Sequence, residues 1–154
     1  MNKQNPGQFA FLTLKKLAQK SVDNTLIKLK HAHDNQRNAQ SQLNVLNDYY
    51  TEYQQRLNDA LSNGIKGCEL SNFNAFISAI EHGIEQQKKL LLTLDIKQKQ
   101  ITNELNQSQK NLNTFTTLLN KQHQKYMQQQ SRLQQKMTDE FAQQQLARRA
   151  LNEY

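Results

Sequence analysis

The sequence predicts an all-α protein: a long two-stranded antiparallel coiled coil, a helical hairpin, in which the second helix is longer than the first. Only 36% of the 154 residues are hydrophobic and the mean hydropathy is −0.92, which suits a narrow seam between helices better than a globular core. The chain contains one proline and four glycines, so long stretches lack helix breakers. Its apolar residues recur at intervals of three and four, as in a coiled coil.

One break in the helical pattern is expected where Asn63-Gly64 and Gly67 lie close together, because glycine readily adopts the positive φ that ends a helix. We expect the first helix over about 8–61, a linker over about 62–71 and the second helix over about 72–150, in a single coiled-coil domain that spans 1–154. Ser71 is the expected N-cap of the second helix, since its hydroxyl can accept a bond from a first-turn N–H.

Each predicted helix carries an unbroken seam with alternating steps of three and four, which is typical of a left-handed coiled coil. In the first helix the seam is Ala18, Val22, Thr25, Leu29, Ala32, Gln36, Ala39, Leu43, Leu46, Tyr50, Tyr53, Leu57 and Ala60. In the second it is Phe73, Ile77, Ile80, Ile84, Gln87, Leu91, Leu94, Gln98, Ile101, Leu105, Ser108, Leu112, Phe115, Leu119, Gln122, Tyr126, Gln129 and Leu133. Pairing outward from the linker sets Ala60 near Phe73 and Ala18 near Phe115.

The second helix is expected to extend beyond the end of the first. At a rise of ~1.5 Å per residue the second helix spans ~120 Å and the first spans ~80 Å. From about Lys125 to Tyr154 it has no partner in the chain, yet it keeps an apolar stripe. The stripe consists of Leu133, Met137, Phe141, Leu146 and Leu151. A lone helix with such a stripe is marginal in water, so we expect a partner protein to cover it.

No residue pattern predicts catalysis, a cofactor or a metal site. His31 and His33 are two residues apart, so on a helix they face different sides and cannot share an ion. The sequence has no phosphate-binding glycine loop, nucleophile elbow or Cys/His cluster, and its only cysteine is Cys68. We expect a non-enzymatic protein.

Membrane insertion is not expected either. No stretch approaches the ~18 uninterrupted apolar residues that a membrane span requires. The apolar residues near Phe9 are soon followed by Lys15-Lys16, which is unlike a signal peptide. The expected location is cytoplasmic.

The formal net charge of +7 leaves acidic partners open, nucleic acid included. However, basic residues are scattered along both predicted helices with acidic ones between them, and no basic run exceeds two residues, as in Arg148-Arg149. This pattern favours solvated helix faces over nucleic-acid binding. Basic residues on the overhanging part, such as Lys125 and Lys136, also suit an acidic cavity in a protein partner. A generic coiled-coil scaffold or a nucleic-acid-associated protein remains the alternative function.

Three groups of residues carry a resemblance to a known family. The stretch from Asp48 to Tyr53 leads into Asn63-Gly64-Ile65; residues 73–81 and 84–87 follow, and Lys136-Met-Thr-Asp-Glu-Phe-Ala142 stands near the end. In order and spacing these resemble the FliJ family of the bacterial flagellar type III export apparatus, over nearly the whole chain.

The resemblance implies a stalk that inserts both chain ends into the hexameric export ATPase, promotes ring assembly and links the ring to the cytoplasmic linker of the export gate protein. It also implies export chaperones as partners, and a location at the inner face of the cell membrane through the export apparatus. The ATPase-binding residues would be Leu133, Met137, Phe141, Arg148 and Arg149.

The same resemblance implies a gate-binding patch just after the linker. Its residues would be Phe76, Ile80, Gly83 and Gln87. Ile80 and Gln87 also belong to the predicted seam. The family pattern can hold Ala at Gly83 and His at Gln87.

Overall fold

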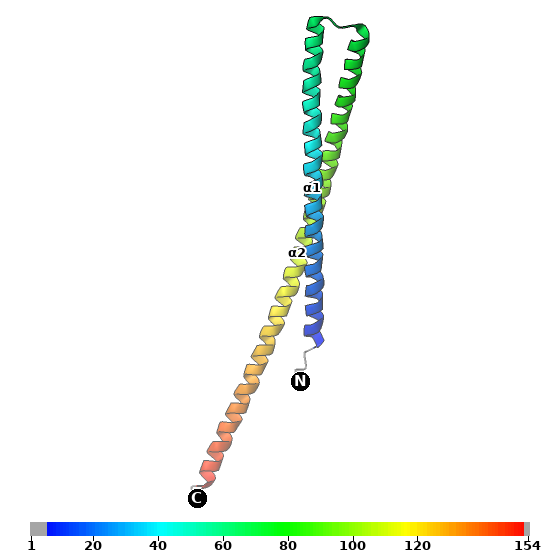
Figure 1. Ribbon diagram of the computed structural model, residues 1–154. Coiled ribbons are helices and arrows are strands. Elements are labelled where there is room, and N and C mark those ends of the chain that lie inside the picture. The colour runs from blue at the N-terminus through cyan, green and yellow to red at the C-terminus, as the bar shows by residue number, and fades with distance from the viewer. Residues whose placement is uncertain (1–5, 153–154) are drawn as a thin grey trace. The chain divides into compact units, whose positions relative to one another are not determined.

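The computed structural model describes the backbone of residues 6–152 and the side chains of residues 9–149. Two helices make up this part of the chain, α1 (Pro6–Asn63) and α2 (Gly67–Asn152), and they pack against each other as a helical hairpin (Figure 1). The described residues contain no strand, and α2 has 86 residues against 58 in α1. The predicted fold class is therefore confirmed, including the longer second helix.

The turn between the helices is shorter than the predicted linker over 62–71. Gly64 has a φ of 84°, and its N–H donates to the carbonyl oxygen of Leu61 at 3.4 Å. Between Pro6 and Asn152 only residues 64–66 lie outside the helices. The N–H of Leu70 already donates to the carbonyl oxygen of Lys66, so Ser71 lies inside α2 and is not its N-cap. One residue with positive φ is enough to end a helix, and Gly67 then starts the next one.

By their contacts the residues form two units, each built from parts of both helices. The turn unit is Val22–Gln107, and the end unit comprises Met1–Ser21 with Ser108–Tyr154.

Within the turn unit every predicted seam residue is buried or half-buried, which confirms the seam there. Small side chains of α1 occupy alternate seam positions: Thr25, Ala32 and Ala39 are all 5% exposed or less. On α2 the most buried seam residues are larger, among them Ile77, Ile80 and Ile101, and Ile101 lines a groove together with Ala32. Alternating small and large residues let the two helices interdigitate, and burial of this seam stabilises the hairpin.

The observed register differs from the predicted one by about one helical turn. Pairing Ala60 with Phe73 would set Tyr53 against Ile80, but the Tyr53 ring lies 4.3 Å from that of Phe76 and 6.4 Å from that of Phe73. The prediction was wrong because it assumed a linker of ten residues. The shorter turn brings earlier residues of α2 opposite each position of α1.

In the end unit the seam continues and then stops. Ala18 and Leu112 are buried, and the hydroxyl oxygens of Ser21 and Ser108 lie 3.1 Å apart. Phe115, Leu119 and Gln122 are half-buried, whereas every side chain from 123 to 149 is exposed. Tyr126, Gln129 and Leu133 thus continue the seam pattern in sequence but have no partner helix among the described residues.

Candidate partner-binding surfaces

The described residues contain no group of three or more His, Cys, Asp or Glu side chains placed to hold a metal ion. His33 faces Gln98 of α2, with each ring nitrogen 3.4 Å from Nε2 of that glutamine, while His31 lies on another side of α1. The described helices also contain no segment apolar enough over sufficient length to cross a membrane. The surfaces of interest are therefore those where apolar side chains remain exposed.

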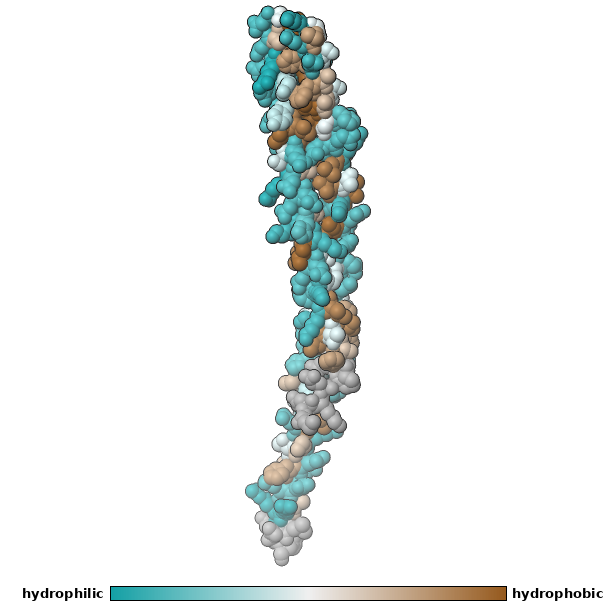
Figure 2. Space-filling model, turned by 45° about the vertical axis from the view of Figure 1, so that its right-hand side comes forward, coloured by the Kyte–Doolittle hydropathy of each residue, from teal (hydrophilic) through white to brown (hydrophobic). Residues whose placement is uncertain are grey.

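Phe76, the first residue of the predicted gate-binding patch, is exposed on α2 two to three turns after the chain reverses. Its side chain is 47% exposed, and its ring lies tilted by 35° against the ring of Tyr53 on α1. Contact with Tyr53 covers one face of the ring and leaves the remainder open. Figure 2 shows apolar side chains gathered near this end of the turn unit, interrupted by polar ones.

The other three residues of that patch lie between the helices. Ile80 is 6% exposed and belongs to the core. A Cβ atom on Gly83 would lie 3.6 and 3.7 Å from the two methyl carbons of Leu46, so Leu46 covers this position. The structure therefore brings the four residues onto one stripe of α2, but of their side chains only that of Phe76 is exposed.

Gln87, the last of the four, ties the helices together. Its Nε2 lies 2.8 Å from the carbonyl oxygen of Ala39 and 3.1 Å from Oε1 of Gln42, and it donates to both oxygens on α1. This glutamine occupies a seam position, and its hydrogen bonds are made only in the observed register.

A hollow beside Phe76 was not predicted. It is open to solvent, has a volume of about 340 Å³ and is lined by Tyr53, Glu69, Asn72, Phe73 and Phe76. Tyr53 has a second neighbour on its own helix, since the guanidinium carbon of Arg56 lies 5.4 Å from the centre of the ring. The hollow could have been predicted from the tyrosines in the stretch from Asp48 to Tyr53. Their place opposite Phe76, however, depends on the register of the two helices.

The predicted ATPase-binding residues lie in the exposed part of α2. Leu133, Met137 and Phe141 are 56%, 69% and 62% exposed, and four-residue spacing places them on one stripe of the helix. Arg148 and Arg149 are also exposed. Leu146 is 67% exposed, while Leu151, also expected on this stripe, lies outside the described side chains. No described segment of the chain covers the stripe.

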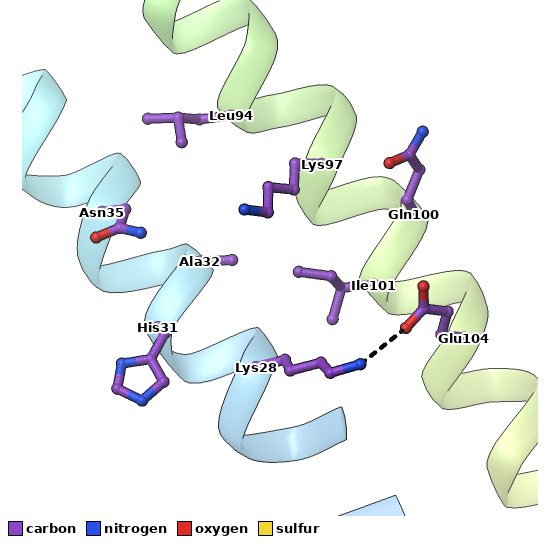
Figure 3. A pocket seen from close by; sticks show the side chains of 9 residues that line it. All are labelled: Lys28, His31, Ala32, Asn35, Leu94, Lys97, Gln100, Ile101 and Glu104. Atoms are coloured by element: carbon purple, nitrogen blue, oxygen red, sulfur yellow. Dashed lines mark ion pairs between the residues drawn. The ribbon is translucent and has the colours of Figure 1, made fainter. Parts of the chain in front are cut away.

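A further groove of about 420 Å³ lies between the helices of the turn unit, next to Ala32 (Figure 3). The Nζ of Lys28 and a carboxylate oxygen of Glu104 meet across it at 3.7 Å, and Lys97 extends into it from α2. Both partners of the ion pair are more than half exposed, so solvent screens it and its contribution is small. The groove follows from the small side chain of Ala32 and carries no arrangement typical of catalysis.

The family model and two of the relatives that match the chain carry the same description. A family model described as "Flagellar FliJ protein" matches residues 8–151. The Flagellar FliJ proteins of Salmonella typhi and of Escherichia coli strain K12 are each 33% identical to the chain over 134 residues, which is 87% of this chain and 91% of those proteins. A solved structure from Chlamydia trachomatis, described as a YscO homolog, aligns over 90% of both chains with a TM-score of 0.49 and 17% identity.

Proposed function

Because the chain belongs to the FliJ family of flagellar proteins, and is thus a component of type III protein export, we propose that it acts as a non-enzymatic stalk of the export apparatus. In this role its chain ends insert into the hexameric export ATPase and promote assembly of the ring. Its turn unit contacts the cytoplasmic linker of the export gate protein. Export chaperones are further partners in this proposal, and the protein works at the inner face of the cell membrane through the apparatus.

The observation that carries the proposal is the exposed apolar stripe of α2. Leu133, Met137 and Phe141 leave more than half of each side chain in water, and monomeric proteins seldom expose such a run without a partner. The end unit contains residues from both ends of the chain, so an ATPase ring that binds this unit would receive α1 and α2 together.

The contact with the gate protein is assigned to the ends of α1 and α2 that adjoin the turn. In the proposal the side chain of Phe76 inserts into the gate linker. Ile80, Gly83 and Gln87 keep α1 packed against α2 next to this contact. Tyr53 supports the ring of Phe76 from below, so the contact would bury an aromatic pair. Aromatic side chains with one free face are frequent anchors in protein interfaces.

The test is the ATPase activity and ring assembly of the export ATPase from the same organism, with and without this protein. The full chain is expected to stimulate both, and a chain that ends at Lys125 is expected to stimulate neither. Circular dichroism of both chains controls for folding. Equal stimulation by the two chains would contradict insertion of the α2 end, because the shorter chain lacks the whole stripe.

A further inference from the structure

The charge of the protein is divided unequally between the two units. Ten described side chains of the end unit are basic and two are acidic, a formal excess of eight positive charges. The basic ones are Lys15, Lys16, Lys20, Lys110, Lys121, Lys125, Arg132, Lys136, Arg148 and Arg149, and the acidic ones are Asp139 and Glu140. The turn unit has nine basic and ten acidic residues, an excess of one negative charge. The scatter of charge expected from the sequence therefore holds only for the turn unit.

The positive charge of the end unit is not neutralised within the described part of the chain. The ion pairs of the described residues, such as Lys28 with Glu104 and Lys99 with Asp95, lie in the turn unit. Between Glu104 and Asp139 the sequence of α2 has no acidic residue at all. Like charges at this density repel one another, so an acidic partner would relieve the repulsion as well as attract the unit.

Four of these basic residues form a ladder on the exposed part of α2. Lys121, Lys125, Arg132 and Lys136 follow one another at steps of four, seven and four residues, which confines them to a strip about 60° wide and ~22 Å long. All four are exposed. The ladder runs beside the stripe of Leu133 and Met137, about a quarter turn away, whereas the other flank of that stripe carries uncharged residues, namely Met127, Ser131, Gln134 and Thr138.

We propose that this basic ladder binds an acidic wall of the protein cavity that receives α2. The inference rests on the proposed function, because it takes the export ATPase ring as the owner of that cavity. The apolar stripe offers about one large side chain per turn, a narrow seam that fits a groove between protein segments. Between Lys121 and Thr138 the charge lies on one flank only, so the ladder fixes which way this part of the helix faces inside the cavity.

A membrane surface or a nucleic acid fits these observations less well. A helix that lies in a lipid interface has a broad apolar face and a strongly charged polar face, whereas here the basic residues flank only one side of the stripe and the other side carries uncharged ones such as Ser131, Gln134 and Thr138. A nucleic acid would be bound by phosphate contacts, with no use for Leu133, Met137 and Phe141 beside them.

The experiment compares two charge-reversal variants of the full chain. The ladder variant combines Lys125→Glu, Arg132→Glu and Lys136→Glu, and the matched control combines Lys30→Glu, Arg37→Glu and Lys89→Glu on exposed sites of the turn unit. Binding to the assembled ATPase ring is measured by titration at low and high salt. The ladder variant is expected to bind about tenfold more weakly at ~50 mM salt, and this difference should shrink at ~500 mM because salt screens exposed charges. The control should stay within about threefold of the native chain at both salt concentrations.

Equal affinity of the ladder variant and the native chain at low salt would overturn the inference. The proposed function is judged separately by the chain that ends at Lys125 and by the pair Leu133→Ala with Met137→Ala. If these lose binding while the ladder variant keeps it, the stalk stands and the ladder fails; if they bind as the native chain does, the stalk fails. Ladder-dependent binding to phosphatidylglycerol vesicles or duplex DNA that is tighter than binding to the ring would also overturn the inference.

Discussion

Phe76 is the residue on which the gate proposal depends. Its side chain is 47% exposed and touches Tyr53, so its truncation removes one aromatic contact of about 1 kcal/mol and leaves the seam intact. We expect Phe76→Ala to weaken binding to the gate linker by at least about tenfold, since aromatic anchors contribute more than 1 kcal/mol to an interface. A pull-down followed by titration measures this.

Leu92→Ala is the matched control for Phe76→Ala. Leu92 is 66% exposed on the same helix and lies outside the proposed patch, so its loss should leave gate binding unchanged. Thermal unfolding of both variants shows whether the hairpin is intact. If Phe76→Ala binds the gate linker as well as Leu92→Ala does, Phe76 is not an anchor.

Two glutamines of the seam differ in how well their polar atoms are paired. Gln98 has a buried Oε1 without a hydrogen-bond partner, whereas Gln87 donates to two oxygens of α1. We expect Gln98→Leu to raise the free energy of unfolding by about 1 kcal/mol, because it removes an unpaired polar atom from the seam. Gln87→Leu should give no such gain, since it removes two bonds of about 0.5–1.5 kcal/mol each. Chemical denaturation of both variants tests the contrast, and an equal gain would refute it.

At the scale of the helices, replacing two glycines by alanine is expected to have opposite effects on stability, because the two glycines differ in backbone conformation. Gly83 lies inside α2 with room for a methyl group against Leu46, so Gly83→Ala should stabilise the hairpin by roughly 0.5–1 kcal/mol through helix propensity. Gly64 has a φ of 84°, a conformation that costs an L-residue about 1–2 kcal/mol, so Gly64→Ala should destabilise it. Thermal melts compare the two; a loss of stability in Gly83→Ala would mean that the close contact with Leu46 requires glycine.

The seams could be predicted from the sequence because helical spacing alone decides which side of a helix is buried. Each predicted seam residue from Val22 to Leu105 is buried or half-buried. The register could not be predicted, because it depends on where α2 starts: the sequence indicated Ser71 as the N-cap, whereas α2 begins at Gly67. The exposure of Phe76 and the burial of Ile80 follow from helical spacing alone. The contact between the rings of Phe76 and Tyr53 depends on the register of the two helices. The residues assigned to the gate and to the ATPase stay predictions, because their roles depend on surfaces of other proteins.

For the molecule as a whole, the two units should contribute unequally to stability. Side chains from 123 to 149 make no contact with α1 that would bury them, so residues 126–154 add little to the cooperative unit. We expect deletion of residues 126–154 to lower the helical signal in circular dichroism and to leave the melting temperature within about 5 °C of the full chain. A large drop in melting temperature would show that the α2 end stabilises the hairpin.

The single reversal of the chain at Gly64 has a consequence for how the protein folds. Contacts between the helices join residues of steadily greater sequence separation, from 45 for Gln42 with Gln87 to 65 for His33 with Gln98 and 87 for Ser21 with Ser108. Closing a loop costs about 0.6 kcal/mol more with each doubling of its length, and every inner contact shortens the loop that the next must close. Folding is therefore expected to start next to Gly64 and to proceed away from the turn, one pair of facing residues of α1 and α2 after another. The contact between Ser21 and Ser108 would form late in folding and break early in unfolding. During synthesis, α1 would remain unpaired until α2 has been translated.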